Sequence, residues 1–185
     1  MRVPVVDNPP QRYLHLYKLF LIPQIFLIGP LPPYSYYGLM LDKTYLDYQI
    51  TDDIRRMNFV RIQSWLTNTY WVPGITLDEV EKSGRNSSLV VGALGPDKTQ
   101  VGYLRVVSDK FRFAYLMDVY TESTHRKKGL ATAMIRFAFD HPDFQTIQTW
   151  LLATRDSQPV YEPLGFKPLE HPERWMAITR AWRKI

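Results

Sequence analysis

The 185-residue sequence contains no cysteine, and this absence excludes several classes of protein. A disulfide-stapled fold, a cysteine nucleophile and a thiolate metal site all need that residue. The four histidines, at His15, His125, His141 and His171, are scattered, and none is spaced from another as a zinc-binding pair would be. We therefore expect no metal site. We expect a cytoplasmic protein, a setting with which the missing cysteines are compatible.

The chain also has no uninterrupted apolar run of the length that a membrane span requires, which is about 20 residues. Its most apolar stretch, residues 19–28, contains Pro23, and no small-residue cleavage site for a secretory signal follows it. Half of the 14 prolines lie before residue 45. We expect residues 1–44 to be a Pro-rich, apolar extension that packs loosely on a domain or stays mobile. An over-extended gene start is the alternative, and a membrane anchor is not expected.

Positive charge exceeds negative charge by five, with 23 Lys and Arg against 18 Asp and Glu. A nucleic-acid binder should carry a basic face interleaved with stacking aromatic residues or a known module, and neither is present. We therefore expect no nucleic-acid partner. A polyanionic ligand accounts for the central basic cluster of Arg126, Lys127 and Lys128.

Residues 45–185 are expected to form one domain. Alternating and helical apolar patterns predict, in order, a strand at 44–50, a helix at 54–67, a helix after Thr76, strands at 88–94, 100–107 and 113–120, a helix at 129–139, a strand at 146–154, a helix at 158–164, and a closing strand pair at 166–169 and 174–179. This order is typical of an α+β domain with a mixed sheet.

The most informative stretch is residues 119–134, where an apolar strand turns through basic residues into a helix. The first N–H groups of a helix have no partner within it, and the helix dipole adds positive charge there. Gly129 lacks the Cβ that would hold a phosphate away from the backbone, and Ala131 is nearly as small. The basic cluster adds full charges beside this turn. A pyrophosphate is the ligand that suits the arrangement best.

The glycine pattern is neither a P-loop nor the three-glycine fingerprint of dinucleotide-binding proteins. What remains is Arg-x-x-Gly-x-Ala, formed by Arg126, Gly129 and Ala131. In isolation this hexapeptide is more typical of a basic turn before an ordinary amphipathic helix.

Its context resembles the GNAT superfamily of N-acetyltransferases over about residues 45–179. Residues 118–132 are similar to the motif that holds the pyrophosphate of acetyl-CoA. Residues 100–105 are similar to the strand before that motif. Residues 151–156 and 161–166 resemble the following strand and the tyrosine-bearing helix with its Gly-Phe ending. The resemblance implies a mixed, mostly antiparallel twisted sheet flanked by helices.

The resemblance also implies a function: transfer of an acetyl group from acetyl-CoA to a primary amine of a small molecule or peptide by direct attack. A catalytically inactive CoA-binding or regulatory module is the alternative, and a homodimer is left open. The cofactor-binding residues that it implies are Val119, Tyr120, Thr121, Arg126, Lys127, Lys128, Gly129, Leu130, Ala131, Thr132, Thr154 and Ser157.

Two residues are the candidates for catalysis. Tyr161 matches the tyrosine that protonates the CoA thiolate in many members, although a packing role is the alternative. Asp118 is a carboxylate within an apolar strand, where a charge is costly unless it is paired or functional. It is a candidate general base, or else the partner of Arg105 or Arg155. Glu122 is a further candidate base.

Tyr70 and Trp71 lie after the first helix, in the connection that borders the acceptor pocket of such enzymes. They are candidate substrate contacts, with plain aromatic packing as the alternative. Three positions depart from the family pattern. Thr154 stands for a frequent asparagine, Ser157 for a frequent alanine, and Lys127 for a common glycine, which a negative φ there would allow.

Overall fold

The computed structural model describes residues 40–178, so residues 1–39 of the extension predicted at 1–44, and the end of the chain after residue 178, lie outside the described residues. Residues 42–44 of that predicted extension belong to the first strand of the sheet. Six strands form one sheet in sequence order: β1 (Asp42–Tyr45), β2 (Tyr48–Thr51), β3 (Leu89–Leu94), β4 (Gln100–Ser108), β5 (Phe113–Thr121) and β6 (Thr149–Leu151). Neighbouring strands are antiparallel except β5 and β6, which are parallel. The predicted mixed, mostly antiparallel sheet is confirmed.

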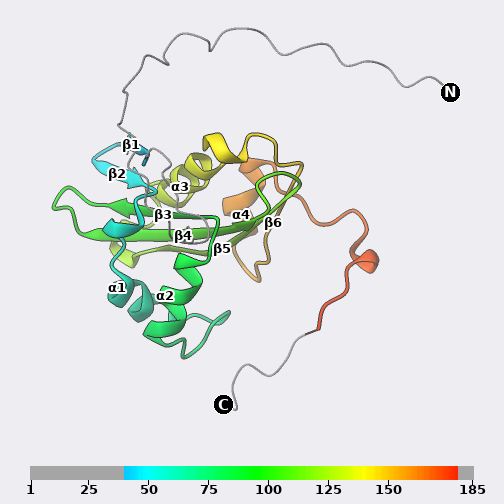
Figure 1. Ribbon diagram of the computed structural model, residues 1–185, viewed down its shortest axis with the longest axis horizontal. Helices are drawn as coiled ribbons and strands as arrows, with labels where there is room; N and C mark the ends of the chain where they lie inside the picture. Colours follow the sequence, from blue (N-terminus) through cyan, green and yellow to red (C-terminus); the bar gives the residue numbers. More distant parts are fainter. Residues whose placement is uncertain (1–39, 179–185) are drawn as a thin grey trace, which may run out of the picture. The chain divides into compact units, whose positions relative to one another are not determined.

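Helices cover both faces of this sheet. Helices α1 (Phe59–Leu66) and α2 (Leu77–Arg85) lie on one face, and α3 (Leu130–Phe139) and α4 (Gln158–Tyr161) lie on the other (Figure 1). Short 3-10 turns occur at Ile54–Arg56, Ser123–His125, Pro142–Phe144, Glu162–Leu164 and Pro172–Arg174. Between residues 40 and 178, none of the helices has the length and apolar character needed to cross a bilayer.

The two cores follow from the alternation of side chains along the strands. On β3, Val90 packs with the buried residues of α1 and α2, whereas Leu89 and Val91 pack with those of α3. Helix α3 contributes its apolar stripe of Leu130, Ala133, Met134, Ile135, Phe137 and Ala138. Each large side chain buried in this way stabilises the fold by about 1.5–3 kcal/mol. This packing fixes the first turn of α3 against the centre of the sheet.

The predicted elements around the centre of the chain are found, with two corrections near the N-terminal side. The predicted strand at 44–50 is a hairpin, because Leu46 adopts a left-handed φ of 51° and turns the chain between β1 and β2. The predicted helix at 54–67 is broken. Asn58 caps α1 by accepting from the Arg61 N–H at 3.0 Å, and its own N–H donates to Gln100 Oε1 at 2.7 Å. The capping box of Thr76 and Glu79 starts α2 as predicted.

Two further predictions fail at the C-terminal side. The predicted strand at 146–154 is reduced to β6, and the predicted closing pair does not form within the described part, which ends before Thr179. Pro168 and Pro172 supply a reason, because proline has no N–H to donate to a sheet ladder. Residues 167–178 are instead exposed.

A β-bulge shapes the second half of β5. Tyr103 pairs with Tyr120 but Arg105 pairs with Met117, so the β5 side of the ladder contains one extra residue. Asp118 lies at this bulge with a left-handed φ of 53°, and its side chain is only 2% exposed. Its carboxylate accepts from Arg105 Nε at 2.5 Å. Of the roles left open for Asp118, the geometry favours a structural pair with Arg105 that holds the bulge.

We expect Asp118→Asn to lower the free energy of unfolding by about 3 kcal/mol, because it leaves the guanidinium of Arg105 buried without its counter-ion. Urea denaturation measures this change. The matched control is Asp140→Asn, which removes an exposed pair with Lys43 at 3.3 Å and should cost less than about 1 kcal/mol. Equal, small losses in both variants would contradict the structural role.

Candidate functional site

The site lies where β5 and β6 separate. The two strands pair only from Phe113 to Tyr115 on β5 and from Thr149 to Leu151 on β6. Beyond Tyr115, β5 has no strand partner on its β6 side among residues 40–178. The bulge at Asp118 lies in this part of β5, which pairs with β4 but not with β6. A cavity of about 650 Å³ occupies the opening, which is within the usual range for ligand sites.

Segments far apart in the sequence line this cavity. They are the end of α1 with the turn after it, the end of β5, the loop into α3, and the segment that contains α4. The lining residues are Trp65, Asn68, Thr69, Tyr70, Trp71, Val119, Tyr120, Thr121, His125, Arg126, Lys127, Gly129, Leu130, Ala131, Thr132, Asp156, Ser157, Val160 and Tyr161. The structure therefore brings together all of the sequence-predicted site residues except Asp118, Glu122, Lys128 and Thr154.

The loop from Arg126 to Gly129 forms the basic end of the cavity. Gly129 is the N-cap of α3 with a left-handed φ of 74°, and a Cβ there would collide with the hydroxyl of Tyr45. That hydroxyl donates to the carbonyl of Lys128 at 3.1 Å. The glycine is thus required by its φ and by Tyr45, in addition to any need for close approach of a ligand. The residues of the first turn of α3, whose N–H groups have no partner within the helix, line the cavity.

Lys127 also adopts a left-handed φ, of 60°, so the negative φ that would have suited the replacement of glycine does not occur. A non-glycine residue held in this region costs on the order of 1–2 kcal/mol. The side chain is exposed beside the cavity and contributes positive charge there. Lys127 therefore strains the backbone of the loop, and its positive charge favours the binding of an anion in the cavity.

Two more groups point to a ligand with polar oxygens. Arg126 Nε donates to the carbonyl of Thr121 at 3.0 Å, and its guanidinium lies over the ring of Tyr120, 5.6 Å from the centroid. These contacts hold the charge at the cavity edge. Thr121 Oγ1 is buried in the same wall with no hydrogen-bond partner within the described part of the chain. A buried polar atom without a partner is rare and indicates a missing ligand or water.

Lys128 faces away from the cavity. Its Nζ donates to Tyr48 Oη at 3.4 Å, and the same hydroxyl lies 2.9 Å from His125 Nδ1. Tyr48 is buried on β2, so these contacts attach the underside of the loop to the sheet. His125 therefore both supports the loop and lines the cavity.

On the opposite side, Tyr161 projects from α4. Burial raises the pKa of its hydroxyl to about 12, and the nearby Tyr70 and Asp156 add to the shift. The phenol consequently stays protonated throughout the physiological pH range. Ser157 lies at the start of the same short helix, where its hydroxyl donates to Asp156 Oδ1 at 3.1 Å.

Four aromatic residues form what we call the aromatic wall: Trp65, Tyr70, Trp71 and Tyr120. Trp65 stacks on Tyr120 with centroids 5.0 Å apart, and Tyr70 meets Trp71 edge to face at 4.9 Å. Arg155 holds Tyr70 in place, since its guanidinium lies 3.9 Å above the ring and its backbone N–H donates to the Tyr70 hydroxyl at 2.9 Å. The wall thus joins the α1 turn to the segment before α4.

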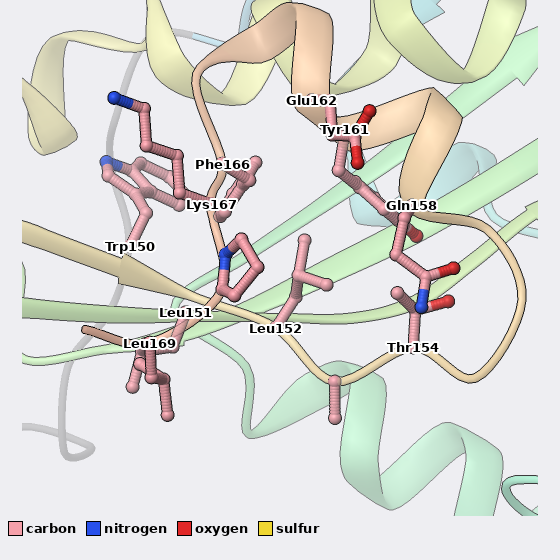
Figure 2. Close-up of a pocket in the computed structure, with 12 residues that line it drawn as sticks. Trp150, Leu151, Leu152, Thr154, Gln158, Tyr161, Glu162, Phe166, Lys167 and Leu169 are labelled. Carbon is pink, nitrogen blue, oxygen red and sulfur yellow. The ribbon is translucent and has the colours of Figure 1, made fainter. Parts of the chain in front are cut away.

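Thr154 lines a second, smaller cavity of about 330 Å³ instead (Figure 2). Figure 2 shows this groove along β6 and its continuation, with Leu152 below and Tyr161 above. Thr154 Oγ1 accepts from the Ser157 N–H at 3.1 Å, so its described contact is with the start of α4. Tyr161 lines both cavities and separates them.

The sequence did not single out six of the lining residues: Trp65, Asn68, Thr69, His125, Asp156 and Val160. The helical apolar pattern predicted Trp65 on the buried face of α1, and the residue lies there. The pattern did not predict that the Trp65 ring also stacks on Tyr120 in the cavity wall. Asn68 and Thr69 directly precede the predicted Tyr70, and that proximity was the available signal. Among the described residues, no group of His, Cys, Asp and Glu side chains is placed to hold a metal ion.

Comparisons with known proteins agree with this geometry. The profile of the acetyltransferase (GNAT) family matches residues 48–166. A search of curated protein sequences found no match. A crystal structure of a protein assigned as a GNAT-family acetyltransferase from Xanthomonas campestris is similar, with 31% identity, a TM-score of 0.68, and coverage of 72% of this chain and 93% of that one.

Two more distant structures share the fold. A protein from Clostridium acetobutylicum, assigned as an acetyltransferase and solved with acetyl-CoA, has 18% identity and a TM-score of 0.53, covering 71% of this chain and 94% of its own. Glucosamine-6-phosphate N-acetyltransferase from Arabidopsis thaliana has 16% identity and a TM-score of 0.55, covering 74% and 99%. The family profile spans more than half of the chain, and the Xanthomonas protein exceeds 30% identity over most of its length. The chain therefore belongs to the GNAT family of acetyltransferases.

Proposed function

We propose that this protein transfers the acetyl group of acetyl-CoA to the nitrogen of a primary amine by direct attack. One observation carries the proposal. A single cavity joins a basic loop at the start of α3, a protonated tyrosine hydroxyl and an aromatic wall. The basic loop suits the phosphates of a thioester such as acetyl-CoA. The tyrosine hydroxyl suits the leaving thiolate, and the aromatic wall suits the acceptor.

The residues present fit acetyl-CoA. Its pyrophosphate would be held by the N–H groups at the start of α3, with Arg126 and Lys127 beside them. The edge of β5 from Val119 to Thr121 would align the pantetheine arm, and Thr121 Oγ1 offers a hydroxyl that now has no partner within the described residues. When bound, acetyl-CoA supplies an acetyl thioester that an amine can attack.

Transfer forms a bond between the amine nitrogen and the acetyl carbon and breaks the bond from that carbon to sulfur. The electron pair of the broken bond goes to sulfur, and the proton lost by nitrogen balances it. Holding both reactants in line supplies much of the rate, on the order of 7–11 kcal/mol in favourable cases. The splayed strands and the aromatic wall provide that alignment.

Tyr161 would stabilise the departing thiolate with a hydrogen bond from its hydroxyl. A thiol has a pKa of about 8.5, so a phenol raised to about 12 is the weaker acid. Complete transfer of its proton to the thiolate would therefore be uphill. Donation of a hydrogen bond, with the proton supplied in the end by the attacking nitrogen, avoids that cost.

The first test is direct. Calorimetry with the full chain should detect saturable binding of acetyl-CoA, and thiol release should require both acetyl-CoA and an amine. Saturable binding without amine-dependent release across a broad amine panel would identify a CoA-binding module instead of an enzyme. The absence of binding would remove the transferase assignment altogether.

We expect Tyr161→Phe to lower kcat about 10- to 100-fold, which is the value of one hydrogen bond to a charged group. The Kd for acetyl-CoA should change by less than about twofold. Because the pKa is raised to about 12, the wild type should show no loss of activity from this group below about pH 11. Tyr115→Phe, a half-buried tyrosine of β5 outside the cavity lining, is the control and should behave as wild type. If Tyr161→Phe had the turnover of the wild type, the role of Tyr161 would be packing and not catalysis.

Two substitutions at Lys127 distinguish the effect of its charge from the effect of its left-handed φ. Lys127→Gly and Lys127→Ala both remove the charge, so both should weaken acetyl-CoA binding several-fold and reduce its dependence on salt. Only glycine relieves the left-handed φ, so Lys127→Gly should be more stable than Lys127→Ala by about 1 kcal/mol. Calorimetry and urea denaturation measure the two effects. Unchanged affinity in both variants would exclude this side chain from the phosphate site.

A further inference from the structure

The chemistry of the aromatic wall restricts the acceptor. The basic loop occupies one end of the cavity, so the wall of Trp65, Tyr70, Trp71 and Tyr120 is left for the amine and the group attached to it. Tyr70 and Trp71 are 41% and 40% exposed, which is unusual for adjacent large aromatic side chains. Because Arg155 and the edge-to-face contact hold them, their surface is preformed for a flat apolar group.

Carboxylates near the wall are already engaged. Asp118 is bound by Arg105, and Glu122 accepts two bonds from Arg61 Nη2, at 2.8 and 2.9 Å. Among the described residues that line the cavity, Asp156 is the one carboxylate. It is more than half exposed, and it contacts Arg155 at 3.3 Å and Ser157 at 3.1 Å. The described site therefore offers little to a polycation and has no buried carboxylate ready to deprotonate an ammonium group.

His125 is the other titratable side chain to weigh as a base. It lies on the basic loop, where its Nδ1 is 2.9 Å from the hydroxyl of Tyr48 and where Lys128 contacts the same hydroxyl. This placement is at the phosphate end of the cavity, beside Arg126 and Lys127. An amine acceptor that is already partly neutral in solution would need neither a carboxylate nor His125 to remove a proton from it.

The pKa of the acceptor amine then decides how fast it can react, because only the neutral amine attacks the thioester. An α-amino group has a pKa of about 7.7–8.0, so about a third of it is neutral at pH 7.5. An alkylamine of the lysine type has a pKa of about 10.4, and only about one molecule in a thousand is neutral at that pH. Without a buried carboxylate among the described lining residues to act as a base, this difference favours the α-amine by a factor of a few hundred.

We propose that the acceptor is an α-amine that carries an aromatic side chain, presented by an amino-acid derivative or by the first residue of a peptide. The proposal rests on the acetyltransferase function proposed above. The aromatic side chain lies against Tyr70 and Trp71, and the neutral nitrogen is directed toward Tyr161. The aromatic contact selects the side chain, and the lack of a buried carboxylate among the described lining residues selects the weakly basic nitrogen.

Thiol release at pH 7.5 with three matched acceptors tests both parts. Phenylalaninamide should exceed alaninamide in kcat/KM by about 10- to 100-fold, which is the value of burying the ring. It should exceed phenethylamine, which has the same ring on an alkylamine, by about 100-fold or more. Raising the pH to 9.5 should increase kcat/KM about 100-fold for phenethylamine but only about threefold for phenylalaninamide.

Variants locate the selectivity. Trp71→Ala should lower the preference for phenylalaninamide over alaninamide about tenfold and leave the Kd for acetyl-CoA unchanged. Trp175→Ala is the matched control, because this tryptophan is 52% exposed and lies outside the cavity lining. It should leave both quantities unchanged. A tripeptide that begins with phenylalanine distinguishes the two sources, since rates above those of phenylalaninamide indicate a peptide terminus.

Two results would overturn the proposal while the acetyltransferase function stands. One is equal kcat/KM for phenylalaninamide and alaninamide, and the other is a faster reaction with phenethylamine or spermidine at pH 7.5. A preference for phenylalaninamide that survives Trp71→Ala would also contradict the assigned contact. If no acceptor in a broad amine panel produced thiol, the proposed function itself would fail.

Discussion

The ion pair between Asp118 and Arg105 is the interaction on which the site depends. It lies at a bulge where β5 gains one residue relative to β4, and it holds Asp118 at a left-handed φ. Bulges bend and twist a strand locally. Here the bend comes just after β5 stops pairing with β6, so the two parallel strands diverge where the cavity begins. A regular ladder would leave no space for a ligand between them.

The second constraint is the attachment of the basic loop to the first hairpin. The left-handed turn at Leu46 brings Tyr45 and Tyr48 into position, where one hydroxyl binds the carbonyl of Lys128 and the other contacts His125. These residues are about 80 positions apart in the sequence. The loop therefore presents its N–H groups from a fixed frame, because the tyrosine end of each contact is anchored in the sheet. Preorganised donors of this kind avoid the cost of ordering the loop on binding.

These two constraints explain what the sequence could and could not predict. The order of the elements from α2 to α4, the capping box at Thr76 and the glycine loop are local patterns, and the structure agrees with them. The hairpin turn at Leu46 and the left-handed φ of Lys127 have no local signal, since neither residue type favours that conformation. The partner of Asp118 was left open between Arg105 and Arg155, because only the register of β4 and β5 decides it. Asp156 and His125 lie in segments that the sequence singled out, next to the predicted Ser157 and Arg126, but only the folded chain shows that their side chains line the cavity.

In the proposed reaction, the segment before α4 would link recognition of the acceptor to the reacting sulfur. Arg155 holds Tyr70 in the aromatic wall, Asp156 and Ser157 follow it, and Tyr161 projects one helical turn later. Tyr70 and Tyr161 line the same cavity, and burial together with the nearby Tyr70 raises the pKa of Tyr161. An acceptor that covers the wall would exclude water from the same phenol. Desolvation of that kind strengthens a hydrogen bond to a developing thiolate, so a well-fitting acceptor would itself improve the step that releases the thiol.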